Sequence, residues 1–505
     1  MSSRAVDYDA LEATTSVEGM TYDDDNQEIL QLLKDDHGDF PCLCISEEVY
    51  GNREYLPYSS EELGWLGHFA KKSAHLVEFS VEGDKAFNNC SQQSVDRFFE
   101  DIGKCNRIRK LHFFGRNDLT EIMRKLDPAI KNNNIKHWSS EGCHLGETEV
   151  NHIFTAFRDM AGLEELSIQY YGIDEHDLND DIMAGCIPSL AACTRMQKLK
   201  LILLDLSTSS CAALSAVFPR MAALHKLVLG ENSIGNDGVE VLIRGLAECK
   251  QLHSVRLYDN RIGDFGLGCS SRGLPASVDT LDLASNEIAL AQQLPLLRFK
   301  ELDLSCNTMS TGGPRVIAAS LANPQCRLET LSLLATNIGD EGAAIVAESL
   351  RCNQRLTIMN LIQNNITDTG WNAFVPILCN PASINATYDS NHTLQDMGYD
   401  HVAYNDDTYI SPDIQSELSL NLCQNKSRVA AAKILKTHRH LDMRPLFDRQ
   451  LDLLPYAVAW LDRFADYHLD IKLSSMFDFV RAMPMEVVNG VAGGKKGKKR
   501  RWRSA

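Results

Sequence analysis

The pattern of apolar and polar positions between residues 224 and 251 repeats along much of the chain. LHKLVLGENSI follows the pattern L-x-x-L-x-L-x-x-N-x-I, and Gly238 then opens a run to Leu246 with apolar residues at helical spacing. The same strand, asparagine turn and helix recur from residue 328 and from residue 356. Because one such unit cannot bury its apolar side alone, it must stack on copies of itself.

Repeat starts in the same phase can be placed along most of the chain, at Leu76, Ile108, Ile135, Leu163, Met196, Leu224, Leu252, Val278, Phe299, Leu328, Leu356 and Ile384. The interval after Val278 is too short for a full helix and predicts a turn or a 3₁₀ segment there. The buried asparagine position is filled by Asn232, Asn260, Asn286, Asn307 and Asn364, and elsewhere by Cys143, Tyr171, Leu204 and Thr336. The predicted fold is α/β, a leucine-rich-repeat solenoid of about twelve or thirteen units with a concave parallel β-sheet and outer helices.

The less regular ends complete a five-part organisation. We predict a disordered acidic N-terminus (1–26), an N-terminal cap with a first degenerate repeat (27–75) and the solenoid (76–398). A helical C-terminal cap (399–490), with helices at 426–438, 448–464 and 474–483, and a disordered basic tail (491–505) follow. A cap is expected because the open end of a solenoid exposes a hydrophobic cross-section.

Composition supports a thin aliphatic core, since 44% of the 505 residues are hydrophobic and only 7% aromatic. The net charge of −18 argues against non-specific nucleic-acid binding by the body of the chain. The fifteen cysteines are odd in number and lack paired spacing, which predicts reduced core thiols. Neither a signal peptide nor a membrane-spanning run is evident, so we expect an intracellular protein, cytoplasmic and/or nuclear, without membrane partners.

With the repeats placed, the chain resembles leucine-rich-repeat proteins of the ribonuclease-inhibitor type (RNI-like), and more closely an algal-type branch with a helical C-terminal cap and a basic tail. The resemblance rests on the repeats at 224–383, the junction NATYDSNHTL (385–394) and the trailing segments AAAKILKTHRHLDMRPLF, LPYAVAWLDRF and FDFVRAMPMEVVNG. It implies a horseshoe with the sheet on its concave side and a role in protein binding. It supplies no catalytic residue.

Side chains between the inward leucines of each strand point out of the concave sheet. They predict a basic zone beside an acidic zone, with a tyrosine at the border and an apolar stretch beyond: Lys198, Lys200, Lys226 and Arg256; Tyr258; Asp282, Glu301 and Asp303; Leu334, Ile358, Ile362 and Tyr388. One hypothesis is a bipolar protein-binding surface whose charges steer a partner. The alternative is that neighbouring opposite charges only neutralise each other, at about 0–1 kcal/mol a pair.

The tail GGKKGKKRRWR matches a short basic nuclear-import signal, carried by Lys495, Lys496, Lys498, Lys499, Arg500 and Arg501. A nuclear-import receptor is therefore a candidate partner. The alternatives are non-specific electrostatic binding of RNA or of an anionic membrane by the tail, or a purely solubilising role.

Enzyme signatures are missing from the sequence: G-x-x-x-x-G-K-[ST], G-x-S-x-G and H-E-x-x-H do not occur. We therefore predict no enzyme and no cofactor. His438, His440 and Asp442 form H-x-H-x-D, and Cys42 and Cys44 lie two residues apart on the first strand, but neither set makes a strong metal motif.

The alternative function is regulation of a small GTPase, as in Ran GTPase-activating proteins, for which Arg53 and Arg116 would be the arginines to consider.

Overall fold

The computed structural model describes residues 7–47, 54–116, 119–171, 178–291, 296–398 and 410–438. The chain divides into two compact units, Met1–Ile288 and Ala289–Ala505, which are described separately below. No helix of the described residues is both long enough and apolar enough to cross a membrane.

The first unit begins with short helices where the sequence predicted disorder. They are α1 (Tyr8–Leu11), the 3₁₀ helix η1 (Val17–Gly19) and α2 (Asp24–Lys34). Tyr8 is buried, and its ring packs edge-on against Trp65 of α3 (Ser60–Ala70) at 4.8 Å between centroids. The prediction was wrong for residues 7–26 because buried Tyr8, Val17 and Met20, together with ion pairs from Asp9 and Glu12 to Lys72, hold this acidic segment in place.

The strands of the first unit form a parallel sheet in the order β2-β1-β3-β4-β5-β6-β7-β8-β9-β10. They are β1 (Cys42–Ser46), β2 (Glu54–Tyr55), β3 (Glu78–Glu82), β4 (Lys110–Phe114), β5 (His137–Glu141), β6 (Glu165–Gln169), β7 (Lys198–Ile202), β8 (Lys226–Val228), β9 (Ser254–Arg256) and β10 (Thr280–Asp282). From β3 onward, each strand starts two residues after a predicted repeat start.

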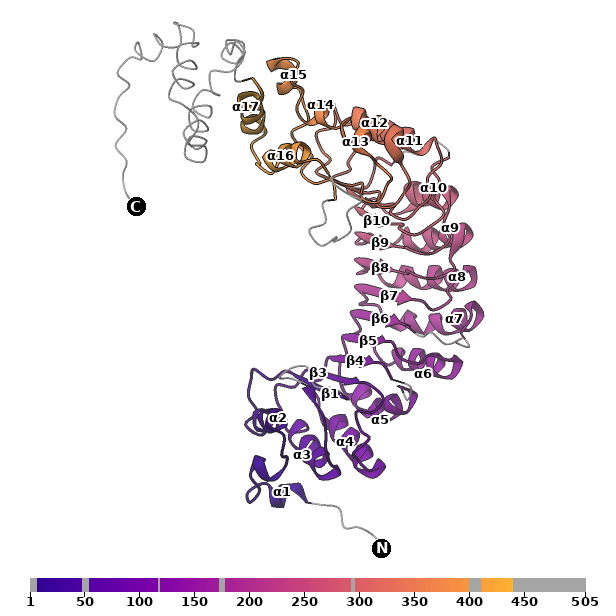
Figure 1. Ribbon diagram of the computed structural model, residues 1–505. Helices are drawn as coiled ribbons and strands as arrows, with labels where there is room; N and C mark the ends of the chain where they lie inside the picture. Colours follow the sequence, from indigo (N-terminus) through magenta and orange to yellow (C-terminus); the bar gives the residue numbers. More distant parts are fainter. Residues whose placement is uncertain are drawn as a thin grey trace, which may run out of the picture. The chain divides into compact units, whose positions relative to one another are not determined.

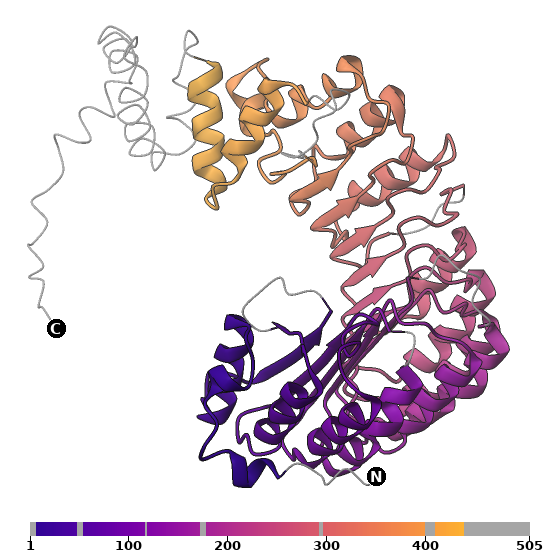
Figure 2. The ribbon, with the colours of Figure 1, turned by 60° about the horizontal axis from the view of Figure 1, so that its bottom comes forward.

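Helices cover one face of this sheet (Figures 1 and 2). They are α3, α4 (Gln92–Lys104), α5 (Leu119–Asn132), α6 (Glu147–Phe157), α7 (Asp180–Cys186) with η2 (Ile187–Ala192), α8 (Thr208–Val217) with η3 (Phe218–Arg220), α9 (Gly235–Leu246) and α10 (Asp264–Gly273). The opposite side of the sheet is called the helix-free face below.

The second unit continues the same repeat. Its strands β11 (Glu301–Asp303), β12 (Thr330–Ser332) and β13 (Ile358–Asn360) are parallel, and its repeat helices are α11 (Gly313–Leu321), α12 (Gly339–Ser349), α13 (Asp368–Trp371) and α14 (Val375–Leu378). As predicted, the repeat that starts at Val278 has no helix in its described residues 283–291 and 296–300.

The predicted repeat start at Ile384 is wrong. Ile384–Tyr388 is the helix α15, whose N-cap Ser383 accepts a hydrogen bond from the Ala386 backbone N–H. The segment that pairs with β13 comes later, at Asp396, which forms a parallel bridge with Ile358.

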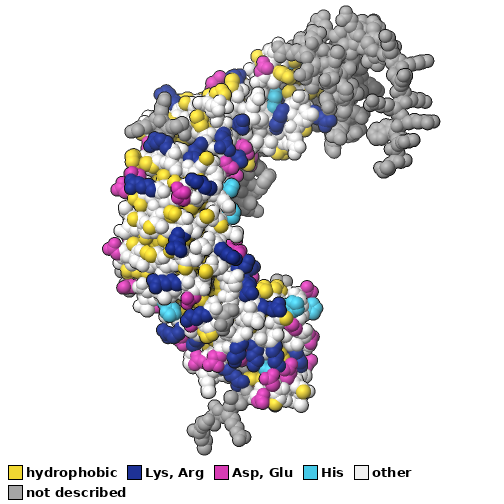
Figure 3. Space-filling view, turned by 180° about the vertical axis from the view of Figure 1, so that it is seen from behind, with side chains coloured by type: hydrophobic (Ala, Val, Ile, Leu, Met, Phe, Trp, Pro, Cys, Tyr) yellow, Lys and Arg dark blue, Asp and Glu magenta, His cyan; other side chains and the backbone are white. Residues whose placement is uncertain are grey.

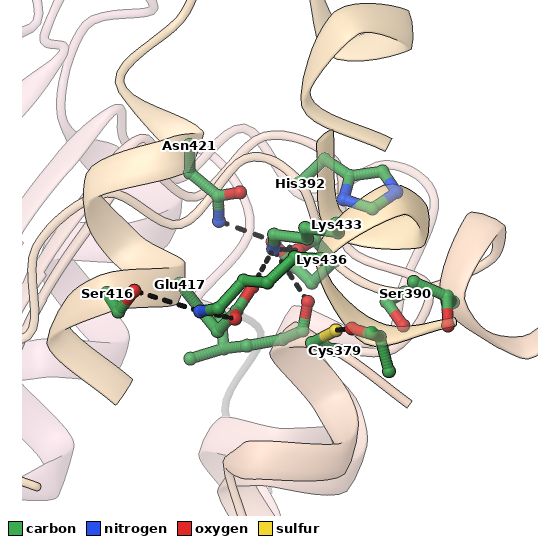
Figure 4. A network of polar contacts seen from close by, with 12 residues as sticks. Cys379, Ser390, His392, Ser416, Glu417, Asn421, Lys433 and Lys436 are labelled. Carbon is green, nitrogen blue, oxygen red and sulfur yellow. Dashed lines mark hydrogen bonds and ion pairs between the residues drawn. The ribbon is translucent and has the colours of Figure 1, made fainter. Parts of the chain in front are cut away.

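Two helices of the predicted C-terminal cap lie in the described residues, α16 (Pro412–Asn421) and α17 (Lys426–Thr437). Lys433 of α17 is fully buried, and its Nζ donates to the carbonyls of Leu378 at 2.6 Å and Asn391 at 3.1 Å (Figure 4). Asn421 of α16 donates to the Leu394 carbonyl at 2.6 Å. The cap is therefore attached to the last repeat through the repeat's own backbone carbonyls.

The predicted asparagine positions form a ladder of buried amides along the strand exits. Asn232 accepts hydrogen bonds from two backbone N–H groups of the preceding unit, Leu204 at 3.0 Å and Leu206 at 3.1 Å. Its Nδ2 donates to three carbonyls, those of Leu201, Leu229 and Gly230. Cys143, Leu204 and Thr336 are buried at their predicted ladder positions, but Tyr171 is not: it is 51% exposed.

All fifteen cysteines are free, and most are buried. Burial raises the pKa of the Cys105 and Cys193 thiols to about 12. These thiols are protonated at neutral pH and act as small apolar core residues.

Candidate protein-binding surface

The helix-free face carries the side chains that the sequence placed between the inward leucines. Leu199 and Leu201 of β7 are fully buried on the helix side, whereas Lys198 and Lys200 are partly exposed. The register puts Lys198 of β7 opposite Lys226 of β8, and Val228 of β8 opposite Arg256 of β9. Lys198, Lys200, Lys226 and Arg256 therefore come together on three consecutive strands, and we call them the cationic cluster.

The cationic cluster is poorly neutralised. Its only ion pair among the described residues joins Lys198 Nζ to Glu165 Oε2 at 3.8 Å. Burial lowers the pKa of Lys226, and the positive charges of the other three members lower it further. On the face drawn in Figure 3, lysine and arginine side chains lie among acidic ones. A group of cations that repel one another at close range favours an anionic partner.

Tyr258 borders the cluster, as predicted. Its ring lies over Gly230 on the neighbouring strand exit, where a Cβ atom would collide with the ring. Burial raises the pKa of the Tyr258 hydroxyl, and the carboxylates of Glu231 and Asp282 raise it further. Tyr258 is therefore a neutral, half-buried aromatic side chain, and its ring occupies the space that the absence of a Cβ atom on Gly230 leaves open.

The predicted acidic zone is divided between the two units. Asp282 of β10 lies opposite Arg256 in the register of the first unit. Glu301 and Asp303 lie on β11 of the second unit, at the equivalent outward positions on either side of the buried Leu302.

The predicted apolar stretch lies in the second unit, and three of its four residues lie on strands or strand exits there. Leu334 and Ile362 are half-buried, and Ile358 is 38% exposed. Tyr388 does not belong to this stretch, because it ends the helix α15 and not a strand.

Two exposed aromatic residues at strand exits were missed by the sequence reasoning. Phe114 ends β4 and is 52% exposed. Tyr171 follows β6, and its ring lies over Gly142, where a Cβ would be 3.0 Å from Tyr171 Cδ2. The doublet Tyr170-Tyr171 was the available signal: Tyr170 is buried, which leaves Tyr171 outside.

The arginine considered for GTPase regulation is not available for catalysis. Arg116 is only 1% exposed, its guanidinium donates to the Gly83 carbonyl, and it lies over the Phe87 ring at 6.0 Å from the centroid. Arg53 lies outside the described residues, as do Lys495, Lys496, Lys498, Lys499, Arg500 and Arg501 of the predicted import tail.

The two residue sets that the sequence made weak metal candidates gain no support from the described residues. His438 is buried at the end of α17, where its Nε2 is 2.7 Å from Thr387 Oγ1. Its partners in the motif, His440 and Asp442, lie outside the described residues. Cys44 is buried, and this burial raises the pKa of its thiol to about 12.

One group of potential metal ligands does converge, Asp9, Glu12 and His68, with ligand atoms within 4.8 Å of one another. Lys72 Nζ lies in the same place, 2.8 Å from the Asp9 carboxylate and 2.7 Å from that of Glu12. It is also 3.1 Å from His68 Nε2. Because the lysine ammonium already supplies the positive charge, this group is an ion-pair network that fastens α1 to α3.

The chain is similar to curated leucine-rich-repeat proteins. Ribonuclease inhibitor of Mus musculus is 29% identical over 243 residues, covering 47% of each chain, and that of Sus scrofa is 26% identical over 289 residues, covering 49% of this chain and 62% of the relative. NACHT, LRR and PYD domains-containing protein 12 of Mus musculus is 31% identical over 189 residues, covering 37% of this chain and 16% of the relative. The chain thus spans about half the length of the ribonuclease inhibitors and a small part of the third relative.

No family model matches the chain. Among solved structures, an internalin from Listeria monocytogenes aligns with a TM-score of 0.41 and 14% identity, over 71% of this chain and 95% of the internalin.

Proposed function

Because the chain is a leucine-rich-repeat protein of the ribonuclease-inhibitor type, we propose that it is a non-enzymatic scaffold that binds a protein partner through the helix-free face of its sheet. The observation that carries the proposal is the cationic cluster on β7–β9. Only Lys198 of the cluster has an ion-pair partner among the described residues, Glu165, so the other three cations on this rigid sheet offer charge to a partner.

The sheet gives this surface the rigidity that recognition needs. The asparagine ladder and parallel pairing fix β7, β8 and β9, so the cluster loses little conformational entropy of the backbone on binding. The adjacent Tyr258 adds a half-buried aromatic side chain, a residue type enriched in interface hot spots.

Charge reversal within the cluster tests the proposal. We expect Lys200→Glu combined with Arg256→Glu to lose partners that the wild type captures, as measured by affinity purification and quantitative mass spectrometry. The matched control is Arg195→Glu combined with Arg220→Glu. These exposed arginines lie on the connections into β7 and β8, and their reversal changes the net charge equally.

Identical partner lists for the wild type and the Lys200/Arg256 variant would refute the proposal. Equal losses in both variants would show that net charge matters and that the cluster does not.

A further inference from the structure

Strands β6–β9 combine the cationic cluster with a tyrosine at the exit of the first strand and another at the exit of the last. Tyr171 follows β6 and Tyr258 follows β9, while the cluster lies on β7, β8 and β9 between them. Adjacent strands are about 4.8 Å apart, so β6 and β9 are separated by roughly 14 Å. An extended peptide of four or five residues, at about 3.3 Å per residue, covers that distance.

Both rings have fixed positions. Each leans over a glycine on the preceding strand exit, Tyr171 over Gly142 and Tyr258 over Gly230. Tyr171 remains 51% exposed, so most of one ring is open to a partner. Aromatic side chains held in place supply contact area at a low entropic cost.

Carboxylates lie near both tyrosines. Burial raises the pKa of Tyr171, and so do the charges of Glu141 and Glu231. Glu231 also lies within electrostatic reach of Tyr258. The strand exits are therefore aromatic with negative neighbours, whereas Lys200, Lys226 and Arg256 make β7–β9 positive beside the Lys198–Glu165 ion pair.

This distribution of charges and aromatic rings favours one kind of anionic partner over another. A uniformly acidic segment would place carboxylates near Glu141 and Glu231, where like charges repel. A segment that mixes carboxylates with aromatic side chains avoids this cost, because its apolar groups can occupy the tyrosine side of the surface.

We propose that the helix-free face of β6–β9 binds an extended acidic segment of a partner protein in which aromatic residues are interspersed. Its carboxylates contact Lys200, Lys226 and Arg256, and its aromatic side chains pack on Tyr171 and Tyr258. The inference rests on the proposed protein-binding function and specifies the chemistry of the partner.

Two synthetic polymers of matched length test this chemistry with the full chain: poly-L-glutamate and a random copolymer of glutamate and tyrosine. We expect the copolymer to bind about tenfold more tightly by fluorescence anisotropy. Tyr171→Ser should remove most of this preference. Phe265→Ser is the control, because Phe265 is 55% exposed but lies on the outer helix α10.

Lys200→Glu combined with Arg256→Glu should weaken the binding of both polymers and remove the preference for the copolymer. Equal affinities of the wild type for the two polymers, or an equal effect of Tyr171→Ser and Phe265→Ser, would overturn the inference and leave the partner-capture result intact. Absence of binding to either polymer would also overturn it. The proposed function fails separately, if the charge-reversed variant keeps every cellular partner.

Discussion

At the scale of single residues, the ladder amides join neighbouring repeats through buried hydrogen bonds. Asn232 makes five hydrogen bonds to backbone groups of two units, and its replacement by Ala leaves these buried groups without partners. Each unsatisfied buried group costs about 1–3 kcal/mol, with partial relief from relaxation. We therefore expect Asn232→Ala to lower the free energy of unfolding by roughly 3–5 kcal/mol in urea titrations.

Asn372→Ala is the matched control for this prediction. Asn372 is an exposed residue at the end of α13, and its right-handed backbone (φ −61°) is one that alanine also adopts. We expect its replacement to change the stability by less than about 0.5 kcal/mol. Similar effects of the two substitutions would contradict the stabilising role of the ladder.

Lys433 is a second residue with a measurable signature. Burial lowers its pKa from 10.5 to about 8 in the folded chain. Between these two values the unfolded chain binds more protons than the folded chain, so stability rises with pH across this window and is constant below it. At about 1.36 kcal/mol per pKa unit, the rise amounts to roughly 3 kcal/mol.

We expect the wild type to gain this stability relative to Lys433→Met between pH 8 and pH 10, in urea titrations of both proteins. The difference in stability between the two proteins reports on Lys433 alone, because both contain the buried thiols. These thiols titrate in the same pH range, but their raised pKa values make stability fall as the pH rises. Parallel pH profiles of the two proteins would contradict a depressed pKa.

At the scale of elements, the first short helix depends on one close contact. Tyr8 of α1 occupies the space beside Gly64 of α3, and Arg97 lies over its ring at 4.9 Å from the centroid. Gly64→Ala would place a methyl carbon 1.8 Å from the Tyr8 hydroxyl oxygen and 2.4 Å from Cζ. Overpacking costs about 1–3 kcal/mol, although alanine favours the helix itself by about 1 kcal/mol.

We expect Gly64→Ala to release α1, with faster hydrogen exchange at residues 8–12 in mass spectrometry. Gly19→Ala in η1 serves as control, since its added Cβ would be 3.7 Å from the nearest atom. Unchanged exchange in the Gly64 variant would show that Tyr8 does not hold the segment.

The repeat pattern predicted the strands because it fixes both their start and the side that each residue faces. It failed at Ile384, where Ser383 caps a helix and an insertion delays the next strand-like segment to Asp396. Lys198 and Arg256 could be placed from alternation alone. Tyr171 could not, because the choice between two adjacent tyrosines for the buried position depends on packing.

At the scale of the whole molecule, the cationic cluster belongs to a chain of net charge −18. At 0.01 M salt the Debye length is about 30 Å, so an acidic partner experiences the repulsion of the whole chain. At 0.1 M it falls to about 10 Å, which screens this repulsion but leaves contacts with the cluster effective. At 1 M, with about 3 Å, these contacts weaken as well.

Binding of the glutamate–tyrosine copolymer should therefore be strongest at intermediate salt, and anisotropy titrations from 0.01 M to 1 M would measure this. An affinity that falls steadily from the lowest salt would mean that the distant negative charges are not felt at the cluster. An affinity that only rises with salt would place the copolymer on an apolar surface away from the lysines. A maximum near 0.1 M that disappears in the Lys200→Glu, Arg256→Glu variant would assign the attraction to these residues and the repulsion to the rest of the chain.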